Sequence, residues 1–353
     1  MPLVDLKDML DHASHNKYAI ASLPVTSLES VDAVVRTAEE LQAPVILRIS
    51  DNTGINNLLE MLVIAAEHTG QRTSIPLAIH FDRASNTEAG VSAIRMGCNS
   101  IGINALRHEV VEMAHGCGVP VEGQIALTAM DEAQSYIEQT DVDFLSLSTT
   151  ADNWNEAKLQ QIAQIKRNCS LPVGVSAGKP LTAPQLQQLI DLGVATIRLF
   201  DCADTALALA QSGKPDSPQD VYKAISGFVG ENMRALGNAG RASEVLEHCR
   251  KWNPIEHVII FNVSADAKIK VEHMLAHGRQ VLSQIPGVRY VHTGHAVQTG
   301  AAYQFCWLVR FVHTAVIDTY REHPAHKIFA DELFRPIAPE RISIDYEIST
   351  APW

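Results

Sequence analysis

The sequence predicts a (β/α)8 barrel of parallel strands, followed by a smaller α+β domain. Eight short apolar runs alternate with helical patterns over residues 1–243, an alternation typical of parallel βα units. The count of eight favours a closed barrel over an open doubly wound sheet. After residue 255 the order becomes strand, helix, strand, strand, helix, strand, which indicates a ferredoxin-like unit. A chain of 353 residues is long for one domain and suits two.

The elements of the barrel are bounded by changes in apolar pattern and by capping residues such as Ser27. Strands are expected at residues 18–25, 44–50, 75–82, 100–104, 119–124, 143–147, 172–176 and 196–200. Helices are expected at residues 7–16, 27–38, 56–68, 87–96, 108–116, 156–166, 183–192 and 220–240.

The second domain is expected at residues 255–349, after a linker at 244–254. Its strands are expected at residues 256–263, 288–293, 301–311 and 341–347. Its helices are expected at residues 265–284, 315–322 and 325–332. Pro286 and Gly287 end the first of these helices, because neither residue continues a helix well.

Composition narrows the classes of function. A hydrophobic content of 46% with 19% charged residues is typical of a soluble globular protein. A net charge of −12 argues against a nucleic-acid surface. No apolar run reaches the roughly eighteen residues of a membrane span, and the first residues lack the layout of a signal peptide. The six cysteines form no CxxC pair and fit reduced thiols. We therefore expect a cytoplasmic protein with a small-molecule substrate and neither a nucleic-acid nor a membrane partner.

Three stretches of the first domain resemble the class II fructose-bisphosphate aldolases. Residues 80–83, His-Phe-Asp-Arg, end a strand and are similar to that family's His-x-Asp-His motif. Residues 38–47 look like its Ala-Glu-Glu-Leu-x-x-Pro-Val-Ile-Leu stretch, and residues 114–122 look like its Ala-His-x-x-Gly-Val-x-Val-Glu. The resemblance covers nearly all of residues 1–243 and implies the barrel fold.

The same resemblance places Asp82 on the family's catalytic aspartate but departs at its zinc ligands. Arg83 falls on one ligand histidine, and a guanidinium has no lone pair for a metal. Ser176 falls on another, and the loop 148–154 that should carry the third has no histidine. The resemblance therefore implies that no metal and no other cofactor is bound at a site of the family's type.

The residues expected at the carboxyl ends of the barrel strands are a mixture of cations and carboxylates. As catalytic groups we expect Asp82 for proton transfer and Lys179, which could also form a Schiff base. The expected substrate-binding residues of this domain are Arg83, Asn104, Glu122, Ser176, Gly178, Arg198 and Asp201. The alternative is that the pairs Asp82–Arg83 and Arg198–Asp201 are salt bridges without a catalytic role.

The second domain resembles the stress-responsive dimeric α/β-barrel (Dabb) family. The similarity rests on residues 320–326, Tyr-Arg-Glu-His-Pro-Ala-His, with His257 on the first strand and residues 344–346, Ile-Asp-Tyr, at the end. Such domains pair two sheets, so the resemblance implies a homodimer, or a homotetramer if the barrels also pair. It also implies catalytic roles for Tyr320 and His326, similar to a plant polyketide cyclase, with His257 and His323 binding the substrate. The alternative is that His323 and His326 cap or brace a helix junction.

The expected function is carbon–carbon lyase or enolising chemistry, without a metal, on a small anionic carbonyl compound of sugar-phosphate type. Two alternatives stay open. One is a catalytically inactive aldolase homologue that serves as a binding or assembly module. The other is cyclase-like chemistry on a β-keto substrate in the second domain.

Overall fold

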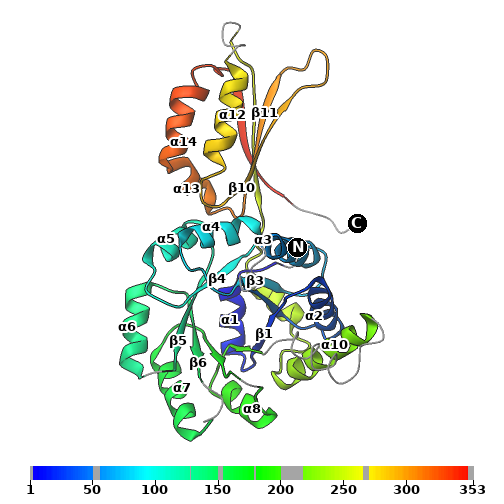
Figure 1. Ribbon diagram of the computed structural model, residues 1–353, viewed down its shortest axis with the longest axis vertical. Helices are drawn as coiled ribbons and strands as arrows, with labels where there is room; N and C mark the ends of the chain where they lie inside the picture. Colours follow the sequence, from blue (N-terminus) through cyan, green and yellow to red (C-terminus); the bar gives the residue numbers. More distant parts are fainter. Residues whose placement is uncertain are drawn as a thin grey trace. The chain divides into compact units, whose positions relative to one another are not determined.

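A computed structural model describes residues 3–50, 56–127, 129–149, 154–178, 180–199, 218–264 and 270–348 (Figure 1). The chain divides into two compact units. One holds residues 1–112, 119–252 and 352–353, and the other holds residues 113–118 and 253–351.

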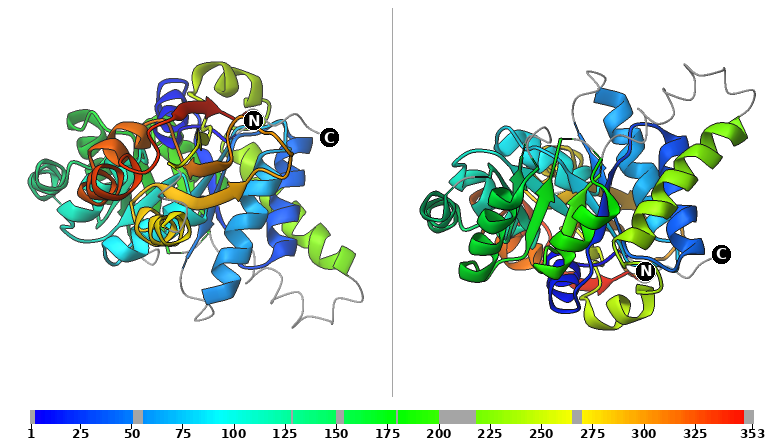
Figure 2. Two further views of the ribbon diagram at one scale, coloured as in Figure 1. Left: turned by 90° about the horizontal axis from the view of Figure 1, so that it is seen from above. Right: turned by 90° about the horizontal axis from the view of Figure 1, so that it is seen from below.

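The first unit contains a closed parallel barrel whose strands follow one another in chain order. The strands are β1 (Ile20–Pro24), β2 (Val45–Ile49), β3 (Leu77–Phe81), β4 (Ser100–Ile103), β5 (Val121–Ala126), β6 (Phe144–Ser148), β7 (Val173–Ser176) and β8 (Thr196–Arg198). Pairing of β8 with β1, through Thr196 opposite Ile20, closes the ring. The strand residues are almost all buried, as a barrel enclosed by helices requires (Figure 2). The predicted (β/α)8 barrel is confirmed.

Helices surround the strands. They are α1 (Leu6–His15), α2 (Leu28–Glu40), α3 (Asn56–Gly70), α4 (Thr87–Met96), α5 (His108–Gly116), α6 (Met130–Thr140), α7 (Glu156–Asn168), α8 (Ala183–Asp191), α10 (Pro218–Ala235) and α11 (Ala242–His248). Ser27 caps α2 as expected, since its hydroxyl accepts from the Ser30 N–H. The sequence did not predict α6, and it placed α11 at the start of the linker.

Apolar side chains fill the amino-terminal end of the barrel. Leu6, Met9 and Leu10 of α1 pack in one buried cluster with Tyr18 and with the first residue of β6, Phe144. Apolar packing therefore closes this end of the barrel. The polar groups of the barrel gather instead at the carboxyl ends of the strands, where (β/α)8 barrels place their sites.

The second unit is an antiparallel four-stranded sheet in the order β10-β11-β9-β12. The strands are β9 (Ile255–Phe261), β10 (Val288–His295), β11 (Phe305–Phe311) and β12 (Arg341–Glu347). Its helices are α12 (Val271–Leu282), α13 (Val316–Glu322), α14 (Pro324–Ile328) and the π-helix η4 (Phe329–Phe334). The element order confirms the ferredoxin-like α+β fold.

Two boundaries in this unit differ from the prediction. The strand expected to begin at residue 301 begins at Phe305, because Gly300 adopts a φ of +79° in the preceding turn. The helix expected at 325–332 is a short α-helix followed by a π-helix. Trp307 on β11 packs its indole edge-on against Phe329, with ring centroids 5.6 Å apart, so the helices cover one face of the sheet. Within the described ranges, no helix combines the length and the apolar character needed to cross a membrane.

Candidate active site

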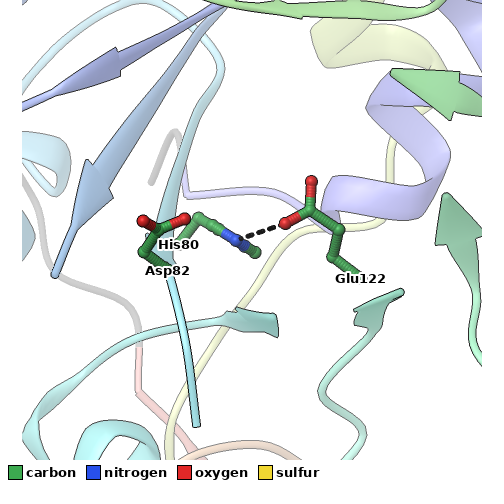
Figure 3. Close-up of side chains that lie close together, drawn as sticks. All are labelled: His80, Asp82 and Glu122. Carbon is green, nitrogen blue, oxygen red and sulfur yellow. Dashed lines mark ion pairs between the residues drawn. The ribbon is translucent and has the colours of Figure 1, made fainter. Parts of the chain in front are cut away.

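The end of β3, the second position of β5 and the end of β8 bring three charged side chains together, although residues 82 and 198 are 116 positions apart in the chain. Nη2 of Arg198 bonds to Oδ1 of Asp82 and lies 2.8 Å from Oε2 of Glu122. His80, on β3, places its Nε2 3.1 Å from the same Glu122 oxygen (Figure 3). We call His80, Asp82, Glu122 and Arg198 the rim cluster.

The hydrogen bonds of His80 define its tautomer. Its Nδ1 lies 3.0 Å from the hydroxyl of Ser100, and that hydroxyl donates to the backbone oxygen of Pro120 at 3.2 Å. Because the Ser100 proton is already used, Ser100 must accept from His80, so Nδ1 carries a proton. Nε2 is buried and makes no hydrogen bond of good geometry, although Glu122 is within ion-pair distance. Nε2 of His80 therefore faces the Glu122 carboxylate inside the barrel.

Gln124 and Gly102 complete the packing around the two carboxylates. The amide of Gln124 donates to Oε2 of Glu122 at 2.8 Å and also to the backbone oxygen of Asp82. Gly102 lies next to it on β4. A Cβ added to Gly102 would collide with the Gln124 amide and would lie 3.1 Å from Oε2 of Glu122. A glycine is therefore needed for β4 to approach the cluster this closely.

A second guanidinium lies beside the rim cluster. Arg48, near the end of β2, donates to the Leu199 backbone oxygen at 3.1 Å and to the Ser22 backbone oxygen at 3.3 Å. Its Nε is 4.0 Å from Oδ1 of Asp82. Two carboxylates thus face two guanidiniums.

The two carboxylates differ in accessibility. The side chain of Glu122 is 3% exposed, whereas that of Asp82 is 20% exposed. Burial alone would raise the pKa of Glu122, but the nearby charges of Arg198 and His80 outweigh burial and lower the pKa to about 2. Glu122 is therefore a permanent anion inside the barrel, and Asp82 is the carboxylate that a ligand can reach.

This pKa predicts a specific acid sensitivity. A carboxyl whose pKa is lower in the folded chain stabilises the fold above its unfolded pKa and stops doing so as the pH falls towards the folded value. With an ordinary pKa of 4.5 and a folded pKa of about 2, Glu122 loses its contribution between those two pH values. We expect the wild type to lose on the order of 3 kcal/mol more than Glu122→Gln across that window, measured by urea unfolding at each pH. If the free energy of unfolding fell equally with pH in the wild type and in Glu122→Gln, the lowered pKa of Glu122 would be contradicted.

The structure separates the residues that the sequence grouped at this rim. Asp82, Glu122 and Arg198 come together as expected. Arg83 and Asn104 are exposed instead, at the ends of β3 and β4. Among the described residues, the arginines beside Asp82 are Arg198 and Arg48, so the expected Asp82–Arg83 pair is wrong.

The remaining candidates of the barrel are placed less centrally. Ser176 ends β7 half-buried, in register with Arg198. Gly178 is exposed and has a φ of +68°, which only glycine adopts easily. Lys179 and Asp201 lie outside the described residues. For Arg198 the described carboxylate partners are Asp82 and Glu122, where the sequence predicted Asp201.

Three residues of the site were not proposed from the sequence: His80, Gln124 and Arg48. Each had a signal. His80 stands two positions before Asp82 and Gln124 two positions after Glu122, and in a strand such residues share a face. Arg48 is the one charged residue in the apolar run 44–50.

The second unit gathers another set of polar side chains on the helix-covered face of its sheet. The ring of Tyr320 lies 4.4 Å from that of His326 and 6.0 Å from that of His257. Nδ1 of His257 is 2.6 Å from a carboxylate oxygen of Asp345. Nδ1 of His326 is 3.1 Å from the Arg321 backbone oxygen, an acceptor, so Nδ1 carries the proton and Nε2 is left as a base. The expected grouping of Tyr320, His326 and His257 is thus present.

Burial sets the acidity of these groups. It raises the pKa of Tyr320 and lowers the pKa of His326, although the bond to the Arg321 carbonyl opposes the second shift. His323 has a structural position: its Nδ1 accepts from the Ala325 N–H at 3.2 Å and caps α14. The alternative, a helix cap, is thus present, and the expected role of His323 in binding a substrate stays a prediction.

The fold and the rim cluster define a (β/α)8-barrel protein with two carboxylates, a histidine and an arginine gathered inside the barrel. The chain belongs to the class II fructose-bisphosphate aldolase family, whose model matches residues 4–241. The stress responsive A/B barrel domain model matches residues 255–348.

Individual relatives agree with this assignment. The chain is 26% identical over 289 residues to fructose-bisphosphate aldolase of Geobacillus stearothermophilus, covering 69% of this chain and 100% of that protein. It is 28% identical over 287 residues to fructose-bisphosphate aldolase of Staphylococcus epidermidis, with the same coverage. Among solved structures, the YdjI aldolase of Escherichia coli K12 superimposes with a TM-score of 0.63 at 22% identity, over 68% of this chain and 99% of that one. At that identity the likeness shows the fold alone.

Proposed function

We propose that the barrel is an enolising enzyme of the aldolase type that works without a metal ion on a small anionic carbonyl compound. The observation that carries this proposal is the bridge from Arg198 to both Asp82 and Glu122. Asp82 would remove a proton from the carbon next to the carbonyl, and Arg198 would offset the negative charge that develops on the oxygen. A substrate oxygen that draws Arg198 away from Asp82 would also free that carboxylate to act as a base.

The donor chemistry of the described residues supports a mechanism without the family's zinc. Of the positions matched to zinc ligands, Arg83 offers no lone pair and Ser176 offers a neutral hydroxyl, which is a weak zinc ligand. These residues do not fit a catalytic zinc, so no step is assigned to one. Arg198, with Arg48 beside it, supplies positive charge at the rim.

Proton exchange tests the proposal directly. Full-length protein is incubated in D2O with fructose 1,6-bisphosphate, with three-carbon ketose phosphates and with small keto acids, and NMR follows loss of the proton next to the carbonyl. For the compound that exchanges, Asp82→Asn should slow exchange by about 100-fold or more, and EDTA should change nothing. Asp191→Asn, an exposed aspartate on α8, is the matched control and should keep the wild-type rate. Equal rates for Asp82→Asn and wild type would refute the role of Asp82.

A second candidate function is a binding or assembly module without catalysis. It is favoured by the pairing of Asp82, Glu122, Arg198 and Arg48 within the described chain, because structural ion pairs also collect charge in this way. Absence of exchange with every compound tested would support the module over the enzyme.

A third candidate places enolising chemistry in the second unit. The free Nε2 of His326 beside the phenol of Tyr320 favours it, because a base and an acid side by side can enolise a β-keto substrate. A β-keto ester in the same exchange assay, with His326→Gln as the variant, separates this chemistry from that of the barrel.

We also propose that the second unit pairs with a second copy of the chain through the uncovered face of its sheet. Ile342, Ile344 and Tyr346 on β12 are 41%, 43% and 47% exposed. Register places Ile342 opposite Ile260 and Ile344 opposite Val258 on that face. Exposed apolar surface of this kind marks an interaction site, and an isologous pair would cover both faces at once.

A further inference from the structure

We propose that the rim cluster is a latent divalent-metal site whose place for the ion is filled by the guanidinium of Arg198. The ligands would be Nε2 of His80, Oδ1 of Asp82 and Oε2 of Glu122. The inference rests on the proposed function only in that both concern the same site. It predicts a binding property that can be measured without turnover.

The three ligand atoms already converge. One ligand atom of each of the three residues lies within 4.8 Å of the others, with His80 on β3, Asp82 directly after it and Glu122 on β5 (Figure 3). Ligands bound to one ion at about 2.1 Å stand roughly 3–4 Å apart, so small side-chain rotations would complete the geometry. One imidazole and two carboxylates form a ligand set that suits Zn²⁺, Co²⁺ or Mn²⁺.

His80 is already arranged as metal-binding histidines are. Such histidines donate their second ring N–H to a fixed acceptor, which sets the tautomer and aims the lone pair. Nδ1 of His80 donates to Ser100, which is fixed in turn by the Pro120 carbonyl. Nε2 is buried in a side chain only 3% exposed, without a hydrogen bond of good geometry, and it faces Glu122.

Arg198 excludes an ion from the wild-type site. Its Nη2 bonds to the two carboxylate oxygens that would bind the metal. Together with Arg48, it already faces both carboxylates with positive charge, so a dication would add further positive charge to the site. Removing one guanidinium leaves two carboxylates facing only Arg48. A unit charge this close, at the effective dielectric constant near a protein surface, changes affinity on the order of 100- to 1000-fold.

Cobalt titration of the full-length chain tests the inference. Wild type should bind no stoichiometric Co²⁺ at the rim, whereas Arg198→Met should bind one Co²⁺ per chain, seen by visible absorption and by a rise in Tm. Arg198→Gln keeps a polar side chain at the position and should bind likewise, so the test does not depend on one variant folding. Arg167→Met, an exposed arginine on α7, is the matched control and should bind none. Adding Glu122→Gln to Arg198→Met should abolish the binding.

Two further measurements link the ion to the guanidinium. Arg198→Lys keeps a cation and should exclude Co²⁺ as the wild type does. Free guanidinium at millimolar concentration should compete with Co²⁺ in Arg198→Met. The inference is overturned if wild type binds one Co²⁺ per chain in a manner lost with Glu122→Gln, or if folded Arg198→Met and Arg198→Gln bind none. Neither result bears on proton exchange by Asp82, so failure here is distinguishable from failure of the proposed function.

Discussion

Replacing Glu122 with alanine is expected to lower the free energy of unfolding by about 3–5 kcal/mol, the usual cost of removing one partner from a buried group of ion pairs. Glu122 accepts from Gln124 and from Arg198, and it lies 3.1 Å from His80. Its side chain is 3% exposed, so little water can enter to replace it. The alanine variant would leave Arg198 with one carboxylate partner and would open a polar void inside the barrel.

Urea denaturation followed by circular dichroism measures this loss. Glu122→Gln keeps an oxygen that can accept from Arg198, so it should cost clearly less than Glu122→Ala. Glu60→Ala, an exposed glutamate on α3, is the control and should stay within about 0.5 kcal/mol of wild type. A loss below about 1 kcal/mol for Glu122→Ala would mean that the ion pairs of the rim cluster contribute little to the fold.

The barrel was predictable because its strands are short apolar runs, a pattern that can be recognised from the sequence alone. Two helices of the barrel domain were missed. On α6, Ala133 and Thr140 are the buried residues, so few of its side chains pack against the core. Helix α11 has seven residues and depends on Val245, which packs in the cluster formed by α1. Tertiary contact rather than local pattern places it.

The sequence predicted that Asp82, Glu122 and Arg198 belong to the site, but it did not predict which side chains pair with one another. The error at residue 83 falls directly after β3, where Asp82 turns to the rim cluster and the next side chain, Arg83, is exposed. The contact between Arg198 and Asp82 exists only after closure of the ring places β8 across from β3 and β5. The tautomer and the ion-pair contact of His80 depend on Ser100 and Glu122, which lie on two other strands. No pattern within one strand contains such information.

Replacing Ile344 with arginine is expected to dissociate the proposed pair of second units. Ile344 is 43% exposed on the edge strand β12, beside Val258 and in line with Leu308 across the sheet. The opposite face of β11 carries Trp307, Val309 and Phe311, each 1% exposed beneath the helices. Leu308 alternates with them and lies on the uncovered face. Around a two-fold axis each substitution occurs twice, and two guanidiniums would enter an apolar contact without partners.

The expected change is at least about 100-fold in the dimer dissociation constant, since each buried unpaired charge costs several kcal/mol. Sedimentation velocity over a micromolar concentration series would measure it. Ser343→Arg is the matched control, because the neighbouring side chain points to the other side of the strand and its arginine should leave the assembly intact. A wild-type chain that stays monomeric at micromolar concentration, or an Ile344→Arg chain that associates as the wild type does, would show that this face does not pair with a second copy. Because the apolar row on β9 and β12 is the same in each copy, a two-fold pair would cover both rows at once, and the dissociation caused by Ile344→Arg should depend on protein concentration.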